Sequence, residues 1–242
     1  MIFNYITVSK TGLKREHNED HIGIFEIDYG LLIVVCDGLG GNRGGEVASK
    51  LAVDTISSEF KNMNKLGIIE RIQYSITKAN ESIIEHSSKD ENLTGMATTA
   101  EVLFLKKDFA YWGHVGDSRI YSSKNGKLQL LSKDHSLVQR LVDEGFITLK
   151  EAENHPNKNI ITRALGESID IEVDLSKIKL KKKENNRFLV CTDGVSGVLN
   201  DSEIEKFINE KNLSNIADKM SRLIEDRGAP DNYSFVLLAE VI

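Results

Sequence analysis

Segments with strand character follow one another along the chain instead of alternating with helices, and this grouping limits the fold more than any other feature. Alternating apolar and polar residues, or short apolar runs, predict strands over 5–9, 21–28, 31–36, 98–105, 109–116, 118–123, 127–132, 170–180, 186–193 and 232–242. Apolar residues three and four positions apart predict helices over 44–60, 66–85, 133–145, 201–211 and 214–227. Strands grouped in this way favour mostly antiparallel sheets with helices on their outer faces over a doubly wound parallel sheet.

A single domain over residues 1–242 is expected from the length of the chain and the absence of a divider within it. The chain contains only two prolines, Pro156 and Pro230, and no repeat or low-complexity tract. The first and last predicted strands both have the character of core strands, which favours one domain that includes both ends. The polar segment 146–168, which contains Pro156, is expected to lie on the surface.

The composition argues against several classes of protein. A formal net charge of −6 disfavours nucleic acids and anionic membranes as partners. No stretch approaches the roughly 18 apolar residues of a membrane span, and the N-terminus lacks the basic and apolar regions of a signal peptide. Cys36 and Cys191 show no disulfide or C-x-x-C pattern, so a reducing cytoplasm is the expected location.

Carboxylates stand at the ends of the predicted strands. Asp37, Asp117 and Asp193 follow apolar segments, and Asp231 precedes the last one. Any one of them alone is more simply a turn residue, because aspartate next to glycine is common at strand ends. Together they would gather negative charge at one edge of a sheet system, and carboxylates a few Å apart strongly oppose joint ionisation.

Divalent cations would remove this conflict, and oxygen ligands favour Mg²⁺ or Mn²⁺ over Zn²⁺. Asp37 can bridge two cations with its two oxygens, and Gly38 offers a backbone carbonyl that no side chain shields. Glu19 and Asp20 add two more acids just before the strand predicted over 21–28.

Seven short motifs occur in a fixed order along the chain. They are REHNED (15–20), VCDGLGG (35–41), TTA (98–100), HVGDSR (114–119), KDHSL (133–137), CTDGV (191–195) and PDNYS (230–234). With these motifs the chain resembles the metal-dependent serine/threonine protein phosphatases of the 2C (PPM) type, most closely their bacterial catalytic domains. The resemblance covers nearly the whole chain and implies an α+β fold, a four-layer α/β/β/α sandwich of two mostly antiparallel sheets flanked by helices.

The resemblance also implies a site with two Mn²⁺ or Mg²⁺ ions per chain, and it allows a third. Asp37 would bridge both ions, Gly38 would bind one through its carbonyl, and Asp193 and Asp231 would complete the protein ligands of one ion. Glu19 or Asp20 would serve the other ion, directly or through water. Asp117, with Asp193, matches a residue pair that can hold the third ion, and Arg15 matches the arginine that grips the substrate phosphate. The expected catalytic residues are therefore Arg15, Asp20 and Asp37.

The implied activity is hydrolysis of phosphoserine and phosphothreonine in proteins by a metal-activated water at the binuclear centre. The implied partners are phosphorylated proteins, including a cognate bacterial serine/threonine kinase, and the protein is expected to be a monomer that binds neither nucleic acid nor membrane. Two alternatives remain at this point: a catalytically dead relative that only binds proteins, and a phosphodiesterase that uses the same ligands. In many eukaryotic relatives a histidine proposed as general acid stands where this chain has Leu39.

Other residues that could carry chemistry have simpler structural interpretations. His114, His135 and His155 are interpreted as structural hydrogen-bonding residues, although His135 is the best placed of the three for proton transfer. Cys36 and Cys191 are interpreted as small buried apolar residues. The lysine-rich run 177–183 is interpreted as an edge strand and the loop after it, where lysine discourages pairing with another sheet, with a docking patch for an acidic partner as the alternative.

Overall fold

The unbroken apolar run of residues 31–36 forms strand β3 (Gly30–Cys36) and is buried on both faces. The computed structural model, which describes residues 1–39 and 44–241, places β3 inside one of two five-stranded sheets. Leu32 and Val34 pack under helices, whereas Ile33 and Val35 face the other sheet. A strand covered on both faces has no polar face, and this explains why its sequence does not alternate.

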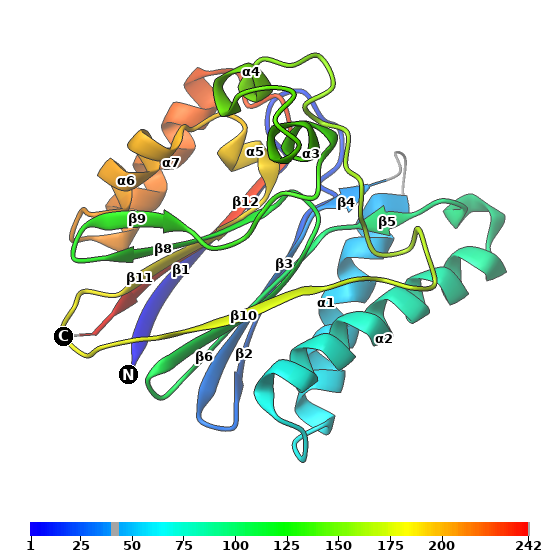
Figure 1. The fold of residues 1–242 in the computed structure, drawn as a ribbon, viewed down its shortest axis with the longest axis horizontal. Coiled ribbons are helices and arrows are strands. Elements are labelled where there is room, and N and C mark those ends of the chain that lie inside the picture. The colour runs from blue at the N-terminus through cyan, green and yellow to red at the C-terminus, as the bar shows by residue number, and fades with distance from the viewer. Residues whose placement is uncertain (40–43, 242) are drawn as a thin grey trace.

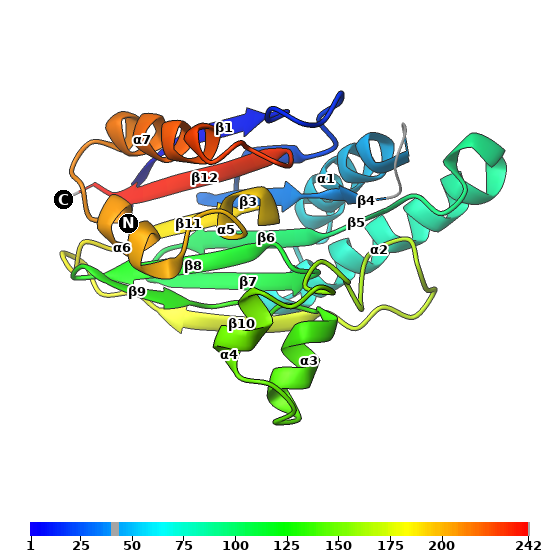
Figure 2. The same cartoon turned by 90° about the horizontal axis from the view of Figure 1, so that it is seen from above.

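The two sheets are antiparallel throughout (Figures 1 and 2). In spatial order the first sheet contains β1 (Phe3–Lys10), β12 (Tyr233–Glu240), β11 (Arg187–Cys191), β8 (Arg119–Lys124) and β9 (Lys127–Leu130). The second sheet contains β10 (Asp174–Lys179), β7 (Phe109–Val115), β6 (Ala100–Lys106), β3 and β2 (His21–Ile27). A small separate ladder pairs β4 (Gly38–Leu39) with β5 (Ala97–Thr98).

Helices cover the outer faces of both sheets and lie at one end of the sandwich. Helices α1 (Gly44–Asn62) and α2 (Ile68–Lys89) pack on the second sheet, and α6 (Asp201–Ile208) and α7 (Leu213–Asp226) pack on the first (Figure 1). The shorter elements are η1 (Glu91–Leu93), α3 (Leu137–Asp143), α4 (Leu149–Glu153) and α5 (Asp193–Ser196). This arrangement confirms the expected α+β sandwich with the layer order helix, sheet, sheet, helix.

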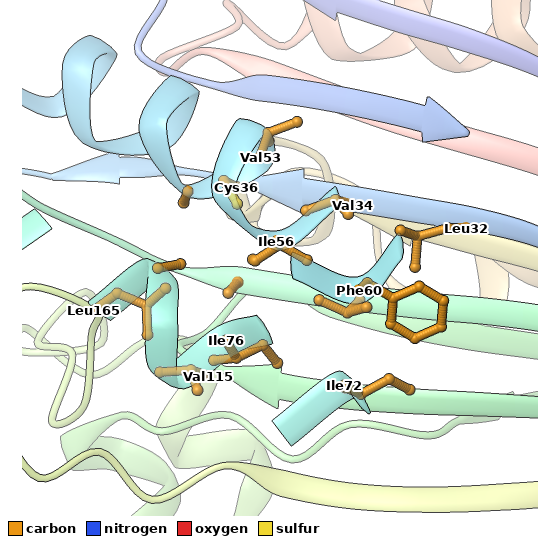
Figure 3. Packing of buried hydrophobic residues seen from close by; sticks show 14 of the residues in the cluster. Leu32, Val34, Cys36, Val53, Ile56, Phe60, Ile72, Ile76, Val115 and Leu165 are labelled. Atoms are coloured by element: carbon orange, nitrogen blue, oxygen red, sulfur yellow. The ribbon is translucent and has the colours of Figure 1, made fainter. Parts of the chain in front are cut away.

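Three apolar clusters follow from this layering. One lies between α1, α2 and the second sheet (Figure 3). In this cluster Phe60 and Phe104 meet edge to face with ring centroids 4.7 Å apart. A second lies between α6, α7 and the first sheet, and the third lies between the two sheets. Trp112 lies in the inter-sheet cluster. Within the described residues, no helix is both long and apolar enough to cross a membrane.

Several local predictions are confirmed and others need correction. Asn125 and Gly126, an Asn-Gly pair that is a sequence signal for a hairpin, both have positive φ in the two-residue turn between β8 and β9. The segment 146–168 does not lie entirely on the surface, because Ala164 and Leu165 are buried and Leu165 pairs with Thr98. It also contains α4, which begins with a capping box of Thr148 and Glu151. Strand β1 is not a core strand, because it pairs only with β12 and lies at the edge of the first sheet. The glycines at 40 and 41 lie outside the described residues.

Candidate metal centre and active site

The antiparallel register brings the ends of strands from both sheets to one end of the sandwich. His21 at the start of β2 lies opposite Cys36 at the end of β3, so Asp20 and Asp37 are neighbours across two strands. Cys191 at the end of β11 lies opposite Phe235 in β12. The predicted acids therefore meet at the end of the sandwich away from the two chain termini (Figure 1).

Asp117 and Asp20 lie where the chain passes from one sheet to the other. Asp117 is in the short connection between β7 of the second sheet and β8 of the first, and it is 8% exposed. Asp20 ends the connection from β1 to β2 and is 5% exposed. Asp37, Asp193 and Asp231 are more accessible to solvent. The cluster thus has two buried acids and three half-buried acids.

Burial and mutual repulsion raise the pKa of most of these acids. Burial is the main cause at each, and it raises the pKa of Asp20 to about 7 and that of Asp193 to about 6. The pKa values of Asp37 and Asp117 lie well above the ordinary aspartate value, first through burial and then through neighbouring aspartates. A hydrogen bond with Asp37 partly offsets this effect at Asp193, because it lowers the pKa of Asp193. The carboxylates are therefore close enough for each to disfavour ionisation of the next.

The donor set of the cluster suits a hard divalent cation. Three buried oxygens have no hydrogen-bond partner in the described part of the chain, which is costly unless a cation or water satisfies them: Oδ1 of Asp20, Oδ1 of Asp117 and Oε1 of Glu19. Among residues 1–39 and 44–241, no three His, Cys, Asp or Glu side chains are already arranged to hold a metal ion. A metal here would need backbone carbonyls or water to complete its ligands, as Mg²⁺ sites in proteins do.

The structure distinguishes between Glu19 and Asp20, which the sequence left as alternative ligands of the second ion. Oδ2 of Asp20 accepts a hydrogen bond from Thr192 Oγ1 at 3.0 Å, next to Asp193. The carboxylate of Glu19 instead lies at the beginning of α1, where a Cβ added to Gly45 would meet Glu19 Oε1 at 2.9 Å. Asp20 therefore belongs to the acid cluster, and Glu19 lies at its margin.

Gly38 is required by packing of the backbone. A Cβ at this position would meet the carbonyl oxygen of Gly45 at 2.2 Å and that of Glu19 at 2.6 Å. Gly38 N also donates a hydrogen bond to Glu19 O at 3.1 Å. The sequence interpretation attributed this glycine to close approach of a metal, whereas close approach of two chain segments already excludes a side chain.

Arg15 reaches the cluster from the connection between β1 and β2. Its Nη2 donates to Oδ2 of Asp231 at 2.8 Å, and both side chains are accessible, 53% and 34% exposed. The carboxylate of Asp231 is the main reason why the pKa of Arg15 is raised. Arg15 therefore places a fixed positive charge at the solvent-facing side of the acids, within reach of a bound anion.

Residues beside the acids hold the connecting segments in place. The buried side chain of Asn232 accepts from Glu19 N at 2.9 Å and donates to Thr11 O and His17 O, both at 2.8 Å. It thus fixes the segment that carries Arg15 to the beginning of β12. Sequence reasoning missed this role, although Asn232 belongs to the PDNYS motif, and a buried asparagine beside an acid is the signal that indicates it.

Thr98 and Thr99 fix the backbone of Asp37 in a similar way. Asp37 N donates to Thr99 Oγ1 at 2.9 Å, and the carbonyl of Asp37 accepts from Thr98 Oγ1 at 2.8 Å. These bonds explain the TTA motif, which the sequence identified without a role. They hold the end of β3 so that the side chain of Asp37 points at the other acids from a rigid backbone.

The histidines have the structural environments that the sequence interpretation favoured. His114 is buried and contacts Glu101 Oε2 at 2.7 Å and the carbonyl of Lys133 at 2.8 Å. His135 Nδ1 accepts from Gly116 N at 3.1 Å, and its Nε2 lies 2.9 Å from Nη1 of Arg163. Burial is the main cause that lowers the pKa of His135 to about 4. His135 therefore supports the turn before Asp117 as a neutral acceptor. Cys36 and Cys191 are buried and free.

Comparison with known proteins identifies similar sequences over nearly the whole chain. Residues 13–236 match the family model described as Protein phosphatase 2C. The serine/threonine phosphatase stp of Listeria monocytogenes serotype 4b is 36% identical over 233 residues, which cover 94% of this chain and 92% of that protein. The protein phosphatase PhpP of Streptococcus pneumoniae serotype 2 is 30% identical, with coverage of 96% and 95%.

Solved structures show the same architecture. The serine/threonine phosphatase Stp1 from Staphylococcus aureus superposes with a TM-score of 0.93 at 30% identity, over 100% of this chain and 96% of that one. The catalytic domain of the serine threonine protein phosphatase PstP in complex with two manganese ions superposes with a TM-score of 0.87 at 29% identity, over 99% of each chain.

Proposed function

This chain belongs to the protein phosphatase 2C family, and from that premise we propose how its own residues hydrolyse phosphoserine and phosphothreonine in proteins. It is a metal-dependent serine/threonine phosphatase that uses Mn²⁺ or Mg²⁺ and acts on phosphoproteins. The observation that carries the proposal is the convergence of aspartates from both sheets at one end of the sandwich, with three buried oxygens left without partners.

The residues proposed to hold two ions are those that the sequence selected. Asp37 would contact both ions, Gly38 would contribute its carbonyl, and Asp193 and Asp231 would complete one ion. Asp20 is proposed for the other ion in preference to Glu19, because its unpartnered Oδ1 lies within the cluster. When bound, such ions act as Lewis acids that lower the pKa of water toward neutrality and offset charge on a phosphoryl group.

Side chains of the protein itself would bind the substrate phosphate and hold the metal ligands in place. Arg15 would bind the substrate phosphate with its planar guanidinium, which it can do because it already lies at the accessible side of the cluster. Thr98, Thr99 and Asn232 hold the backbone segments of the ligands, so little reorganisation is needed when substrate binds. Within residues 1–39 and 44–241, no side chain with a suitable proton is identified for the leaving alkoxide, and water is the proposed donor.

A third ion is proposed between Asp117 and Asp193. Its support is the unpartnered Oδ1 of Asp117 and the effect of Asp193 on the pKa of Asp117, for which it is the largest cause after burial. Asp117 would hold this ion together with Asp193, which is also proposed for the core pair.

We also propose the domain organisation, the cellular location, the oligomeric state and the opposing enzyme of the protein. Residues 1–242 would form a single catalytic domain, which the pairing of β1 with β12 supports. The protein would act in the cytoplasm as a monomer and oppose a serine/threonine kinase. The two free, buried cysteines fit a reducing compartment.

One assay separates this function from its alternatives. Purified protein should hydrolyse a phosphothreonine peptide in the presence of Mn²⁺ and leave a phosphodiester such as bis(p-nitrophenyl) phosphate nearly unchanged. Faster cleavage of the diester would show a phosphodiesterase. Binding of the peptide without release of phosphate, at any Mn²⁺ concentration, would show a catalytically dead relative.

Replacement of Arg15 tests the proposed phosphate contact. Because a hydrogen bond between charged groups contributes roughly 1.5–3 kcal/mol, Arg15→Ala should lower kcat/KM about 10- to 100-fold, mainly through KM. Arg15→Lys should recover only part of the loss, because an ammonium group cannot make the bidentate contact. Mn²⁺ affinity is measured in parallel, since Arg15 also contacts Asp231. Parental kinetics in both variants would place the phosphate contact elsewhere.

A further inference from the structure

Seven lysines gather at the end of the sandwich that lies opposite the acid cluster. Six are exposed and one, Lys106, is half-buried, and within the described residues none of them forms an ion pair. We call this set the lysine patch; it consists of Lys106, Lys107, Lys177, Lys179, Lys181, Lys182 and Lys183. It stands out because the chain as a whole carries a formal charge of −6.

The strand register places three members of the lysine patch on one face of the second sheet, and the other four follow directly on these strands. Lys106 pairs with Phe109 across β6 and β7, and Phe109 pairs with Lys179 across β7 and β10. With neighbouring strands about 4.8 Å apart, Lys106 and Lys179 lie about 10 Å from each other on one face of the sheet. Lys177 Nζ lies 6.0 Å from the ring centroid of Phe109. Lys181–Lys183 follow directly on β10.

Protection of a sheet edge explains only part of this arrangement. Lys177 and Lys179 lie on β10, an edge strand, where lysine prevents pairing with another sheet. Lys106 and Lys107 lie at the turn between β6 and β7, and Lys181–Lys183 lie in the loop after β10. These five do not border the open edge of a strand, so an edge function gives no reason for their positive charge.

The lysine patch lies at a fixed distance from the acid cluster along β10. Asp174 begins β10 opposite His114, close to Asp117, and Lys179 ends it. Five steps of about 3.3 Å place Lys179 roughly 17 Å from Asp174, and the lysines of the following loop lie farther away. Figure 1 shows β10 running toward the end where both termini lie. The patch and the active site are therefore separate surfaces connected by one rigid strand.

We propose that the lysine patch docks an acidic segment of the phosphoprotein substrate while the phosphorylated residue occupies the active site. This inference rests on the proposed phosphatase function and adds a class of preferred substrate. An acidic segment complements seven unpaired cations, and Phe109 provides an apolar surface between them. Docking would raise the local concentration of the phosphorylated residue and would lower KM with little effect on kcat.

Peptides in which an acidic tail lies at a defined distance from the phosphothreonine test the proposal. Each peptide carries one phosphothreonine, then a Gly/Ser spacer of one or twelve residues, then three glutamates or three glutamines. An extended chain spans at most about 3.6 Å per residue, so the tail ends within about 14 Å of the phosphothreonine on the short spacer and within about 54 Å on the long one. Only the tail on the long spacer can reach Lys179 and the loop lysines beyond it. The glutamate tail on the long spacer should lower KM about fivefold or more against the glutamine tail, and 0.5 M NaCl should abolish the difference.

Two variants with the same change of charge show whether the effect of the glutamate tail depends on the lysine patch. Lys179→Glu/Lys182→Glu should remove the advantage of the glutamate tail and leave kinetics on the glutamine-tailed peptides unchanged. Lys206→Glu/Lys211→Glu makes the same change of charge at exposed lysines of the α6–α7 region and should retain the advantage. Thermal melting checks that both variants fold.

Three outcomes would overturn the proposal. The first is equal KM values for glutamate and glutamine tails on the long spacer. The second is an advantage that the short spacer shares or that the Lys206/Lys211 variant loses. The third is binding of the parent, but not of Lys179→Glu/Lys182→Glu, to phosphatidylserine vesicles without any tail effect, which would make the patch a membrane surface. Hydrolysis of the glutamine-tailed peptides tests the phosphatase function separately.

Discussion

Removal of divalent cations by a chelator is expected to abolish hydrolysis of a phosphothreonine peptide, and Mn²⁺ or Mg²⁺ is expected to restore it. The acids at the strand ends repel one another and leave buried oxygens unpartnered, so cations both activate the site and stabilise it. A ligand at 100 times its Kd adds about 2.7 kcal/mol to the free energy of unfolding. Saturating Mn²⁺ should therefore raise Tm by roughly 5–10 °C.

Differential scanning calorimetry with and without Mn²⁺ provides a readout that does not depend on activity. Ca²⁺ serves as a control for nonspecific charge screening, because it demands a larger and more flexible site. Full activity of protein shown to be metal-free by elemental analysis would refute the metal-dependent mechanism.

Replacement of Asp193 and Asp117 by alanine should have different consequences, although both acids belong to one cluster. Asp193→Ala is expected to lose core metal and activity together, because Asp193 is a proposed ligand of the core pair. Asp117→Ala is expected to keep two Mn²⁺ per chain, with kcat reduced about tenfold or more, equivalent to roughly 1.4 kcal/mol. Its Tm should stay near the parental value, because the buried Oδ1 of Asp117 has no partner to lose.

Titration of bound Mn²⁺ together with steady-state kinetics distinguishes these cases. Loss of a core ion in Asp117→Ala would assign Asp117 to the core pair. An unchanged kcat at saturating Mn²⁺ would show that Asp117 is only a turn residue. Asp134→Asn offers a comparison, since Asp134 also lies near Asp117 but pairs with Arg119 at 2.7 Å.

The acids of the site could be selected from the sequence because their signal is local. Asp37, Asp117, Asp193 and Asp231 each stand beside an apolar strand, and two sheets of antiparallel strands necessarily bring several strand ends to each edge. The run 31–36 also revealed a strand buried on both faces without knowledge of its neighbours. The motifs then restricted the family, because their order along the chain is far more specific than any single motif.

Other features depend on contacts between segments that are distant along the chain. Glu19 and Asp20 are adjacent acids, and only the approach of Thr192 and of α1 assigns one to the cluster and the other to its margin. The reason for Gly38 is likewise tertiary, since the backbones of Gly45 and Glu19 fill the space of a side chain.

What the sequence alone determined was therefore the type and order of the elements, the family, and the chemistry of the acids, because these depend on residue type and local periodicity. Tertiary structure decided which acids share a site, which glycine and asparagine support it, and that Arg15 lies beside Asp231. It also decided that lysines from two separate segments form one surface opposite the acids. The physical reason is that side-chain direction and strand register are set by packing across the two sheets, between partners as far apart along the chain as the 216 residues that separate Arg15 from Asp231.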